Sequence, residues 1–300
     1  MADMDPDCSV SFTKGHGTEN DFVLVPDLDG GLELSEAAVR YLTDRRAGIG
    51  ADGVIRVVRS ARADEPQIEA LSDAAEWFMD YRNADGSIAE MCGNGTRVFA
   101  AYLRREGLEV REEFRIATRA GLKTVQVTDD GYAVDLGSWL IEEANQAERE
   151  GFTAVVALDG LPELPGLRVD MGNPHTVVVL PPDVALASLD LTTAPRVAPT
   201  PEHGTNVEFV HIVGPGHIAM RVVERGVGET RSCGTGAAAA AVAVRWWQGP
   251  TDDNREWIVD VPGGRLRVRA TPHGTVELSG PAVLVADGVV SLTSVAVTDR

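Results

Sequence analysis

The sequence predicts an α/β protein (α+β) built from two similar lobes, and two observations support this fold class. The first is a series of short apolar, β-branched runs with only a few helical segments between them. The second is an internal repeat, in which Cys-Gly-x-Gly opens a predicted helix at Cys92 and again at Cys233. In both copies a strand ends in a polar residue, Asn83 or Glu224, nine positions before the cysteine. We therefore interpret the chain as a duplicated half with one cysteine in each lobe.

The predicted elements of the first half are mostly strands. A helix is expected over residues 35–43, with Ser35 as its N-cap, and another over residues 96–105, just after the turn that contains Cys92. The expected strands cover residues 10–13, 22–25, 54–59, 76–82, 113–117, 124–127 and 133–136. The following stretch, residues 138–163, is acidic and then loop-like, so it is the candidate lobe boundary.

The second half repeats this order. A helix is expected over residues 236–247, just after the turn that contains Cys233. A Gly-Pro-Gly turn at residues 214–216 is expected to join the two strands on either side of it. The expected strands cover residues 167–170, 176–180, 206–213, 218–223, 257–261, 266–270 and 276–279.

Charge and composition limit the class of protein. The chain of 300 residues carries a formal net charge of −19, which disfavours nucleic acid and an anionic membrane as partners. No apolar run reaches the roughly 18 residues of a membrane helix, and the first seven residues lack the pattern of a secretory signal. We therefore expect a cytoplasmic protein. Three cysteines are too few for a disulfide framework, and their spacing does not predict a zinc site.

The paired cysteines point to proton transfer at carbon. A cysteine just before a helix lies near the positive end of the helix dipole, which stabilises a thiolate. The helix-start amides can also bind a carboxylate. Inverting a carbon centre requires a base on one face and an acid on the other, and two thiols opposed across a cleft can supply both. Pyridoxal phosphate is not expected, because the only lysines, Lys14 and Lys123, lie outside any phosphate-binding loop.

Seven segments, in order along nearly the whole chain, resemble the diaminopimelate epimerase family: residues 14–22, 48–53, 83–87, 90–95, 171–175, 206–209 and 224–236. The resemblance implies two lobes, each with a barrel-like mixed sheet around a central helix, and an active site in the cleft between them. It implies residues 1–138 plus 284–300 for the lobe with Cys92, and 139–283 for the lobe with Cys233. It also implies that the final strand crosses back to the first lobe.

The resemblance further implies reversible conversion of LL- to meso-diaminopimelate, in lysine and peptidoglycan precursor synthesis, by a homodimer without metal or organic cofactor. Cys92 would be the proton donor and Cys233 the proton acceptor, while His175 and Glu224 would tune the protonation of the thiols. The implied substrate-binding residues are Asn20, Asn83, Gly93, Asn94, Asn173, Asn206, Glu224, Arg225, Gly234 and Thr235.

The chain departs from the family pattern at one substrate-binding position. Many members have Gln where this chain has Gly53, and that Gln contacts the distal end of the substrate. Glycine offers no side-chain hydrogen bond, so how the distal end is held is open at this point. Glu19 is a candidate for part of that role.

Two alternatives stay open. A proline or hydroxyproline racemase of the same fold would use a similar thiol pair on a substrate with one carboxylate. A thiol redox protein, from a different class, would join Cys92 and Cys233 in a reversible disulfide. The third cysteine, Cys8, lies in a polar N-terminal segment and is not expected to be catalytic.

Overall fold

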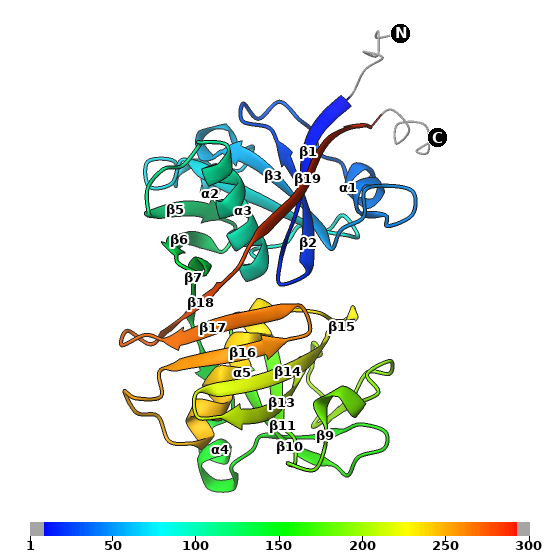
Figure 1. Cartoon of the computed structure of the whole chain (residues 1–300), viewed down its shortest axis with the longest axis vertical. Coiled ribbons are helices and arrows are strands. Elements are labelled where there is room, and N and C mark those ends of the chain that lie inside the picture. Colours follow the sequence, from blue (N-terminus) through cyan, green and yellow to red (C-terminus); the bar gives the residue numbers. More distant parts are fainter. Residues whose placement is uncertain (1–8, 293–300) are drawn as a thin grey trace. The chain divides into compact units, whose positions relative to one another are not determined.

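The computed structural model describes residues 9–292, so Cys8 lies outside the described residues. The chain divides into two compact units (Figure 1). Among the described residues, the first comprises 9–17, 21–134 and 282–292, and the second comprises 18–20 and 135–281. No helix of the described part is long and apolar enough to cross a membrane.

The first unit contains a mixed sheet. Parallel pairing joins β2 to β3 and β4 to β5, whereas β3–β4, β5–β6 and β6–β7 are antiparallel. Its strands are β1 (Ser9–Gly17), β2 (Asn20–Pro26), β3 (Gly53–Arg59), β4 (Trp77–Asn83), β5 (Glu113–Thr118), β6 (Gly121–Thr128), β7 (Gly131–Ser138) and β19 (Val283–Ser291). Two short helices, α1 (Glu36–Thr43) and α2 (Pro66–Glu69), lie in its connections, and the Ser35 hydroxyl caps α1 as predicted.

The helix α3 (Gly93–Arg105) is the central helix of this unit. It packs on β1, β3, β4 and β19, and its residues from Gly93 to Leu103 are all buried. It begins three residues earlier than predicted, because the Cys92 side chain caps it and accepts a hydrogen bond from Gly95 N. The core packs closely against Gly95, since an added Cβ would lie 3.3 Å from Ile55 Cδ1 and from Met79 Cε.

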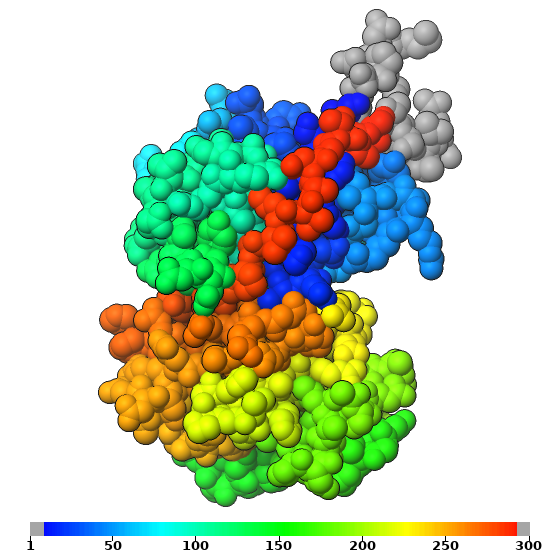
Figure 2. Space-filling model, viewed as in Figure 1, coloured from blue at the N-terminus to red at the C-terminus, as the bar shows by residue number. Residues whose placement is uncertain are grey.

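The last described strand belongs to the first unit. β19 pairs antiparallel with β1 over the whole of its length, with Val290 opposite Val10 and Val283 opposite His16. Figure 2 shows this strand, in red, running over the surface of the first unit beside the blue β1. Val290 of this strand packs against the apolar cluster that contains Val23, Val39 and Leu42.

The second unit is a second mixed sheet around a second helix. Parallel pairing joins β11 to β13 and β14 to β16, and antiparallel pairing joins β10–β11, β13–β14, β16–β17 and β17–β18. Its strands are β8 (Leu140–Ile141), β9 (Ala154–Ala157), β10 (Leu164–Asp170), β11 (Pro174–Val179), β12 (Arg196–Ala198), β13 (Asn206–Gly214), β14 (His217–Glu224), β15 (Gly228–Thr230), β16 (Glu256–Val261), β17 (Gly264–Ala270) and β18 (Thr275–Gly280).

The helix α5 (Gly234–Trp247) is the central helix of the second unit. It packs on β10, β11, β13, β14, β16, β17 and β18. The run Ala237–Ala241 is at most 1% exposed, so the helix is apolar on every side, as a fully enclosed helix must be. Alanine lets the surrounding strands approach closely. The two units therefore share one design, a mixed sheet around a central helix that begins at a cysteine, and the predicted fold class is confirmed.

One part of the predicted organisation is wrong. The stretch 138–163, expected to be loop-like, contains β8, the helix α4 (Ala144–Glu150) and β9. The helix is only seven residues long and is bounded by left-handed residues, Glu143 before it and Gly151 after it. Only Ala147 of this helix is buried, so the segment lacks the apolar period by which a helix is recognised in a sequence.

Candidate active site

The first half of the candidate site is built around Cys92 at the start of α3. The Cys92 Sγ accepts a hydrogen bond from Gly95 N at 3.5 Å, and the side chain is half-buried. The first amides of a helix have no partner within the helix, and they give its N-terminus a partial positive charge. Gly93 and Asn94 occupy this first turn, as the sequence predicted for the residues that bind a carboxylate.

A buried guanidinium lies behind this helix start. Arg97, at 0% exposure, donates from Nη2 to Asn94 Oδ1 at 2.5 Å. Burial lowers the pKa of Arg97 to about 10, and the negative charge of a Cys92 thiolate would act in the opposite direction. A side chain at position 17 would come within 3.1 Å of Arg97 Nη2, so Gly17 leaves room for the guanidinium.

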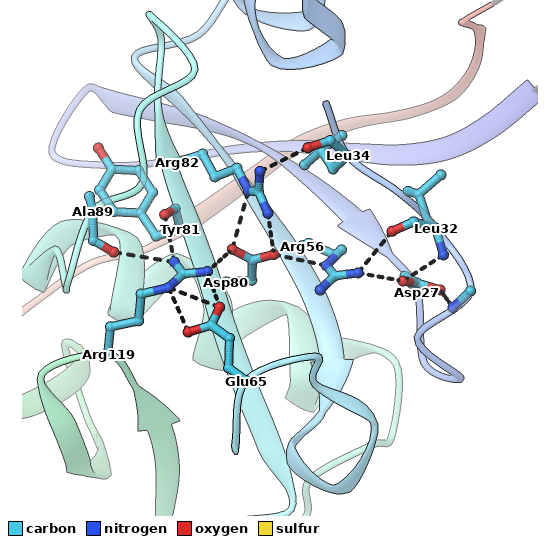
Figure 3. A network of polar contacts seen from close by, with 11 residues as sticks. Asp27, Leu32, Leu34, Arg56, Glu65, Asp80, Tyr81, Arg82, Ala89 and Arg119 are labelled. Carbon is cyan, nitrogen blue, oxygen red and sulfur yellow. Dashed lines mark hydrogen bonds and ion pairs between the residues drawn. The ribbon is translucent and has the colours of Figure 1, made fainter. Parts of the chain in front are cut away.

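The loop that leads to Cys92 is held by a buried ionic network. Figure 3 shows the Asp80 carboxylate between the guanidinium groups of Arg56, Arg82 and Arg119. Burial would raise the pKa of Asp80, but the three arginines reverse this effect and lower it. Arg119 also donates to the carbonyl oxygens of Tyr81 and Ala89, at 3.2 and 3.4 Å, and so joins the two ends of the loop before Cys92.

Within that loop, the predicted substrate ligand Asn83 forms a tight turn. Asn83 N donates to Ser87 O at 2.9 Å, and its Nδ2 donates to Ser87 Oγ at 3.0 Å. Gly86, at φ 91°, closes the turn by donating from N to Asn83 O at 2.9 Å. The Asn83 side chain therefore has one amide hydrogen and its oxygen left for further hydrogen bonds.

The second half of the candidate site is built around Cys233 at the start of α5. Its Sγ accepts a hydrogen bond from Gly236 N at 3.4 Å and lies 3.5 Å from Thr235 Oγ1. The geometry matches that at Cys92, but Cys233 is buried, at 7% exposure. Burial raises the pKa of the Cys233 thiol well above its usual value, and the carboxylates of Glu224 and Glu208 raise it further. The hydrogen bonds of Thr235 and Gly236 act to lower this pKa, as expected of a helix start, but burial and the two carboxylates outweigh them.

Glu224 lies at the end of β14, as predicted. It accepts a hydrogen bond from the Thr230 hydroxyl. Burial raises the pKa of Glu224, and the neighbouring charge of Glu208 adds to this effect. Its charge raises the pKa of the Cys233 thiol, after the effect of burial.

His175 and Glu208 lie in the same cluster. His175, on β11, is 1% exposed, and its Nδ1 is 2.7 Å from the Glu208 Oε1 on β13. The other ring nitrogen, Nε2, is 3.1 Å from Oδ1 of the predicted ligand Asn173. Burial raises the pKa of Glu208, while the charge and hydrogen bond of His175 oppose it. Glu208 was not predicted from the sequence, although one charged residue in the apolar strand 206–213 is a usable signal.

Asn206 and Arg225 are brought together in the second unit. Asn206 Oδ1 accepts a hydrogen bond from Arg225 N at 2.9 Å and so fixes the backbone just after Glu224. The exposed Arg225 guanidinium donates to His203 O at 2.7 Å. Its remaining donors suit a carboxylate of a substrate.

Three positions bear on how the distal end of a substrate could be held: Glu19, Asn20 and Gly53. Glu19 forms an ion pair with Arg231 instead of presenting an unengaged carboxylate. Asn20 begins β2 and is half-buried. A Cβ at Gly53 would lie 2.6 Å from Tyr81 Cε2 and 2.6 Å from Arg82 O, so Tyr81 occupies the space that a side chain at 53 would need. The sequence does not indicate that Tyr81 lies against Gly53, because the two residues are far apart in the chain.

Residues suited to holding a metal do not cluster in the described chain. Within residues 9–292, no group of three or more His, Cys, Asp or Glu side chains is arranged to bind a metal ion. Both described cysteines are free thiols. Each unit offers one thiol next to helix-start amides, and the second unit adds an acid cluster beside its thiol.

Two solved structures share this fold. A phenazine biosynthesis protein of the PhzF family from Bacillus anthracis matches with a TM-score of 0.65 at 16% identity, covering 95% of this chain and 99% of that chain. A hydroxyproline epimerase from Agrobacterium vitis matches with a TM-score of 0.60 at 15% identity, covering 96% of this chain and 94% of that one. At such low identity these similarities establish the fold alone.

Sequence similarity is much stronger. The family model described as diaminopimelate epimerase matches residues 12–141 and 167–285. The diaminopimelate epimerase of Streptomyces coelicolor is 48% identical over 286 residues, which cover 93% of this chain and 94% of that protein. The corresponding proteins of Thermobifida fusca and Mycolicibacterium smegmatis are 47% and 46% identical, over 94% and 92% of this chain and 98% and 95% of theirs. With both cysteine-capped helices inside the matched ranges, this chain belongs to the diaminopimelate epimerase family.

Proposed function

We propose that this protein is a diaminopimelate epimerase that interconverts LL- and meso-diaminopimelate by proton transfer between two thiols. The observation that supports the proposal is the repeated arrangement of a cysteine at the start of a central helix, at Cys92 and at Cys233. Each thiol caps a buried helix and accepts a hydrogen bond from the third residue beyond it, in a chain closely related to named diaminopimelate epimerases.

Two thiols supply and accept all the protons that the epimerisation transfers, so no further reactant is needed. One cysteine, as thiolate, forms an S–H bond to the α-proton while the α C–H bond breaks. The other cysteine, as thiol, delivers its proton to the opposite face of the same carbon. With Cys233 as acceptor, Cys92 is the donor, and the reverse reaction exchanges these roles.

The carbanion formed on proton removal requires electrostatic stabilisation. Helix-start amides at Gly93–Asn94 and Gly234–Thr235 would donate to the α-carboxylate, where charge builds up during the reaction. His175 and Glu224, in the cluster beside Cys233, would set its protonation. The guanidinium of Arg225 and the carboxamides of Asn20, Asn83, Asn173 and Asn206 would hold the polar groups of the substrate.

Hydrogen exchange tests this mechanism. The protein is incubated with LL-diaminopimelate in deuterium oxide, with a thiol reductant and without pyridoxal phosphate, and α-deuterium incorporation is followed. We expect exchange and epimerisation in the unaltered protein, their loss in Cys92→Ser and in Cys233→Ser, and no change in the control Cys8→Ser. Full activity in both serine variants at positions 92 and 233 would exclude the two-thiol mechanism.

The same assay separates the alternatives. Faster exchange with L-proline or hydroxyproline than with LL-diaminopimelate would identify a racemase of the kind seen in the Agrobacterium vitis structure. A redox role would instead require that the Cys92–Cys233 disulfide be part of a working cycle. We expect oxidation only to inactivate the enzyme, with activity recovered by reductant.

We also propose that the enzyme works as a homodimer in the cytoplasm. Two catalytic thiols require a reducing compartment to stay free. The outer face of β19 offers an apolar stripe for a second copy, since Val283, Val285 and Val289 are 45%, 60% and 69% exposed. Sedimentation of the unaltered protein and of Val285→Asp tests this. A monomer in both, or a dimer in both, would exclude this stripe as the interface.

A further inference from the structure

Glu208 is a fully buried acid that the two-thiol reaction does not by itself require. It lies on β13, at 0% exposure, in a strand whose flanking residues Val207, Phe209 and Val210 are apolar and buried. An ionised carboxylate in such a place is strongly destabilising unless it is paired. Its placement therefore demands a cation or a bound proton close by.

The partner of Glu208 is His175. The Oε1 of Glu208 is 2.7 Å from His175 Nδ1, and both side chains are fully buried. The second oxygen, Oε2, has no hydrogen-bond partner among residues 9–292. A single hydrogen bond to a neutral ring would leave the buried charge poorly compensated, whereas an ion pair with an imidazolium compensates it.

The other side of the imidazole supports the charged form. His175 Nε2 faces Asn173 Oδ1 at 3.1 Å, so each ring nitrogen faces an oxygen acceptor. A neutral imidazole carries one N–H and can donate to only one of these oxygens. Only the imidazolium donates to both. Both contacts are therefore hydrogen bonds only if each ring nitrogen of His175 carries a proton.

This ion pair lies directly beneath the start of the Cys233 helix. A Cβ at position 236 would lie 2.7 Å from Glu208 Oε1 and 3.3 Å from Cys233 Sγ, so only glycine fits between carboxylate and thiol. The same Gly236 donates its N–H to Cys233. The titratable groups around the thiol are therefore Glu208 from β13, His175 from β11 and Glu224 from β14.

We propose that Glu208 is a positioning residue for the epimerisation, which fixes His175 as an imidazolium beside Cys233 and Asn173. The proposal rests on the proposed function, because it gives Glu208 a part in the same reaction. The imidazolium offsets one of the two buried carboxylates near the thiol. It also orients the Asn173 carboxamide, which is a predicted substrate ligand, by donating to its oxygen.

The primary test reads the imidazole directly. Protein labelled with ¹⁵N-histidine is examined by NMR near neutral pH, and the His175 signals are assigned by their loss in His175→Gln. We expect both ring nitrogens of His175 to show the imidazolium signature in the unaltered protein and a neutral ring in Glu208→Gln. A neutral His175 in the unaltered protein would overturn the proposal, whether or not the enzyme epimerises diaminopimelate.

Kinetics provide the second test. Glu208→Gln keeps the size of the side chain but removes its charge, and we expect kcat to fall about tenfold to one hundredfold, with a smaller change in KM. In the His175→Gln background the same substitution should have little further effect, because both residues act through one pair. Additive losses in this cycle would show that Glu208 acts independently of His175.

The chain offers a matched control. His217 and Asp260 form another histidine–carboxylate pair of the second unit, with Nε2 and Oδ2 also 2.7 Å apart, but both side chains are partly exposed. Asp260→Asn should leave kcat and the His175 signals unchanged. If Glu208→Gln proves too unstable to purify, Glu208→Asp, which keeps the charge, should retain the imidazolium signals. A neutral ring in Glu208→Asp would contradict the proposal.

Discussion

The ring of Tyr81 fills the space that a side chain at Gly53 would occupy. A Cβ at position 53 would lie 2.6 Å from Tyr81 Cε2, and the Tyr81 hydroxyl would be 3.3 Å from it. Tyr81 in turn packs edge-on against Phe22, with ring centroids 5.8 Å apart. The glycine at this position is therefore a packing requirement of the first unit, and Gln would not fit here without displacing Tyr81.

The first prediction concerns this contact. Gly53→Ala should lower the free energy of unfolding by about 1 to 3 kcal/mol, the usual range for overpacking a filled interior. Thermal or urea unfolding measures the change. Gly214→Ala is the matched control, because no atom lies within 4 Å of the added Cβ at that position. Equal stability of the two variants would show that the Tyr81 contact yields easily.

The second prediction concerns the loop before Cys92. Arg119→Met removes a cation from buried Asp80 and the two donors that hold Tyr81 O and Ala89 O. We expect a loss of about 3 kcal/mol in unfolding free energy, because a buried charge loses a partner. Epimerase kcat should also fall, since the loop before Cys92 loses the hydrogen bonds that join its two ends.

A control for this change is the exposed pair of Arg269 and Glu277. Arg269→Met should alter stability by less than about 1 kcal/mol, as is usual for surface ion pairs. If Arg119→Met lowered stability but left kcat intact, the network would be structural only and the loop would keep its form without it.

The third prediction is a pH dependence of stability. The pKa of Asp80 in the folded protein lies below its unfolded value, because the arginines outweigh the effect of burial. Its contribution is therefore fully present above the unfolded value of about 3.9 and is lost as the pH falls through the lower, folded value. Asp80→Asn should make the dependence of the unfolding free energy on pH less steep below about pH 4. An unchanged slope would contradict the assignment.

The fourth prediction concerns the reactivity of Cys233. The carboxylate of Glu224 raises the pKa of this thiol, after burial itself. Removing the charge in Glu224→Gln should lower that pKa, so iodoacetamide alkylation of Cys233 should begin at lower pH. Peptide mass spectrometry separates Cys233 from Cys92. Glu229→Gln, whose partner is Arg221, is the control and should leave the alkylation profile of Cys233 unchanged.

Much of this architecture could be predicted because it depends on local pattern. The ends of β4 at Asn83 and of β14 at Glu224 are where the sequence placed them, as is the hairpin around residues 214–216. Both central helices were predicted, but α3 begins three residues and α5 two residues earlier than expected. The difference arises because a cysteine acts as the cap at each start, which the usual capping preferences do not indicate.

The rest depends on contacts between residues far apart in the chain. Glu208 meets His175 33 positions away, and Arg119 meets Asp80 39 positions away, so neither pairing is visible in a local window. The raised pKa of Cys233 also arises from residues far apart in the chain. Its helix start looks like that of Cys92 in the sequence, but burial and two carboxylates from other strands decide its pKa.

The pairing of β19 with β1 has a consequence for biosynthesis. Ser9 of β1 is opposite Ser291, so the first unit takes its first strand from one end of the described chain and its last strand from the other. All strands of the second unit precede β19 in the chain, so the second unit is synthesised before the first unit can acquire β19. Until then α3, and with it Cys92, lacks one of the strands on which it packs. The order of synthesis therefore places completion of the first thiol site after synthesis of the second unit.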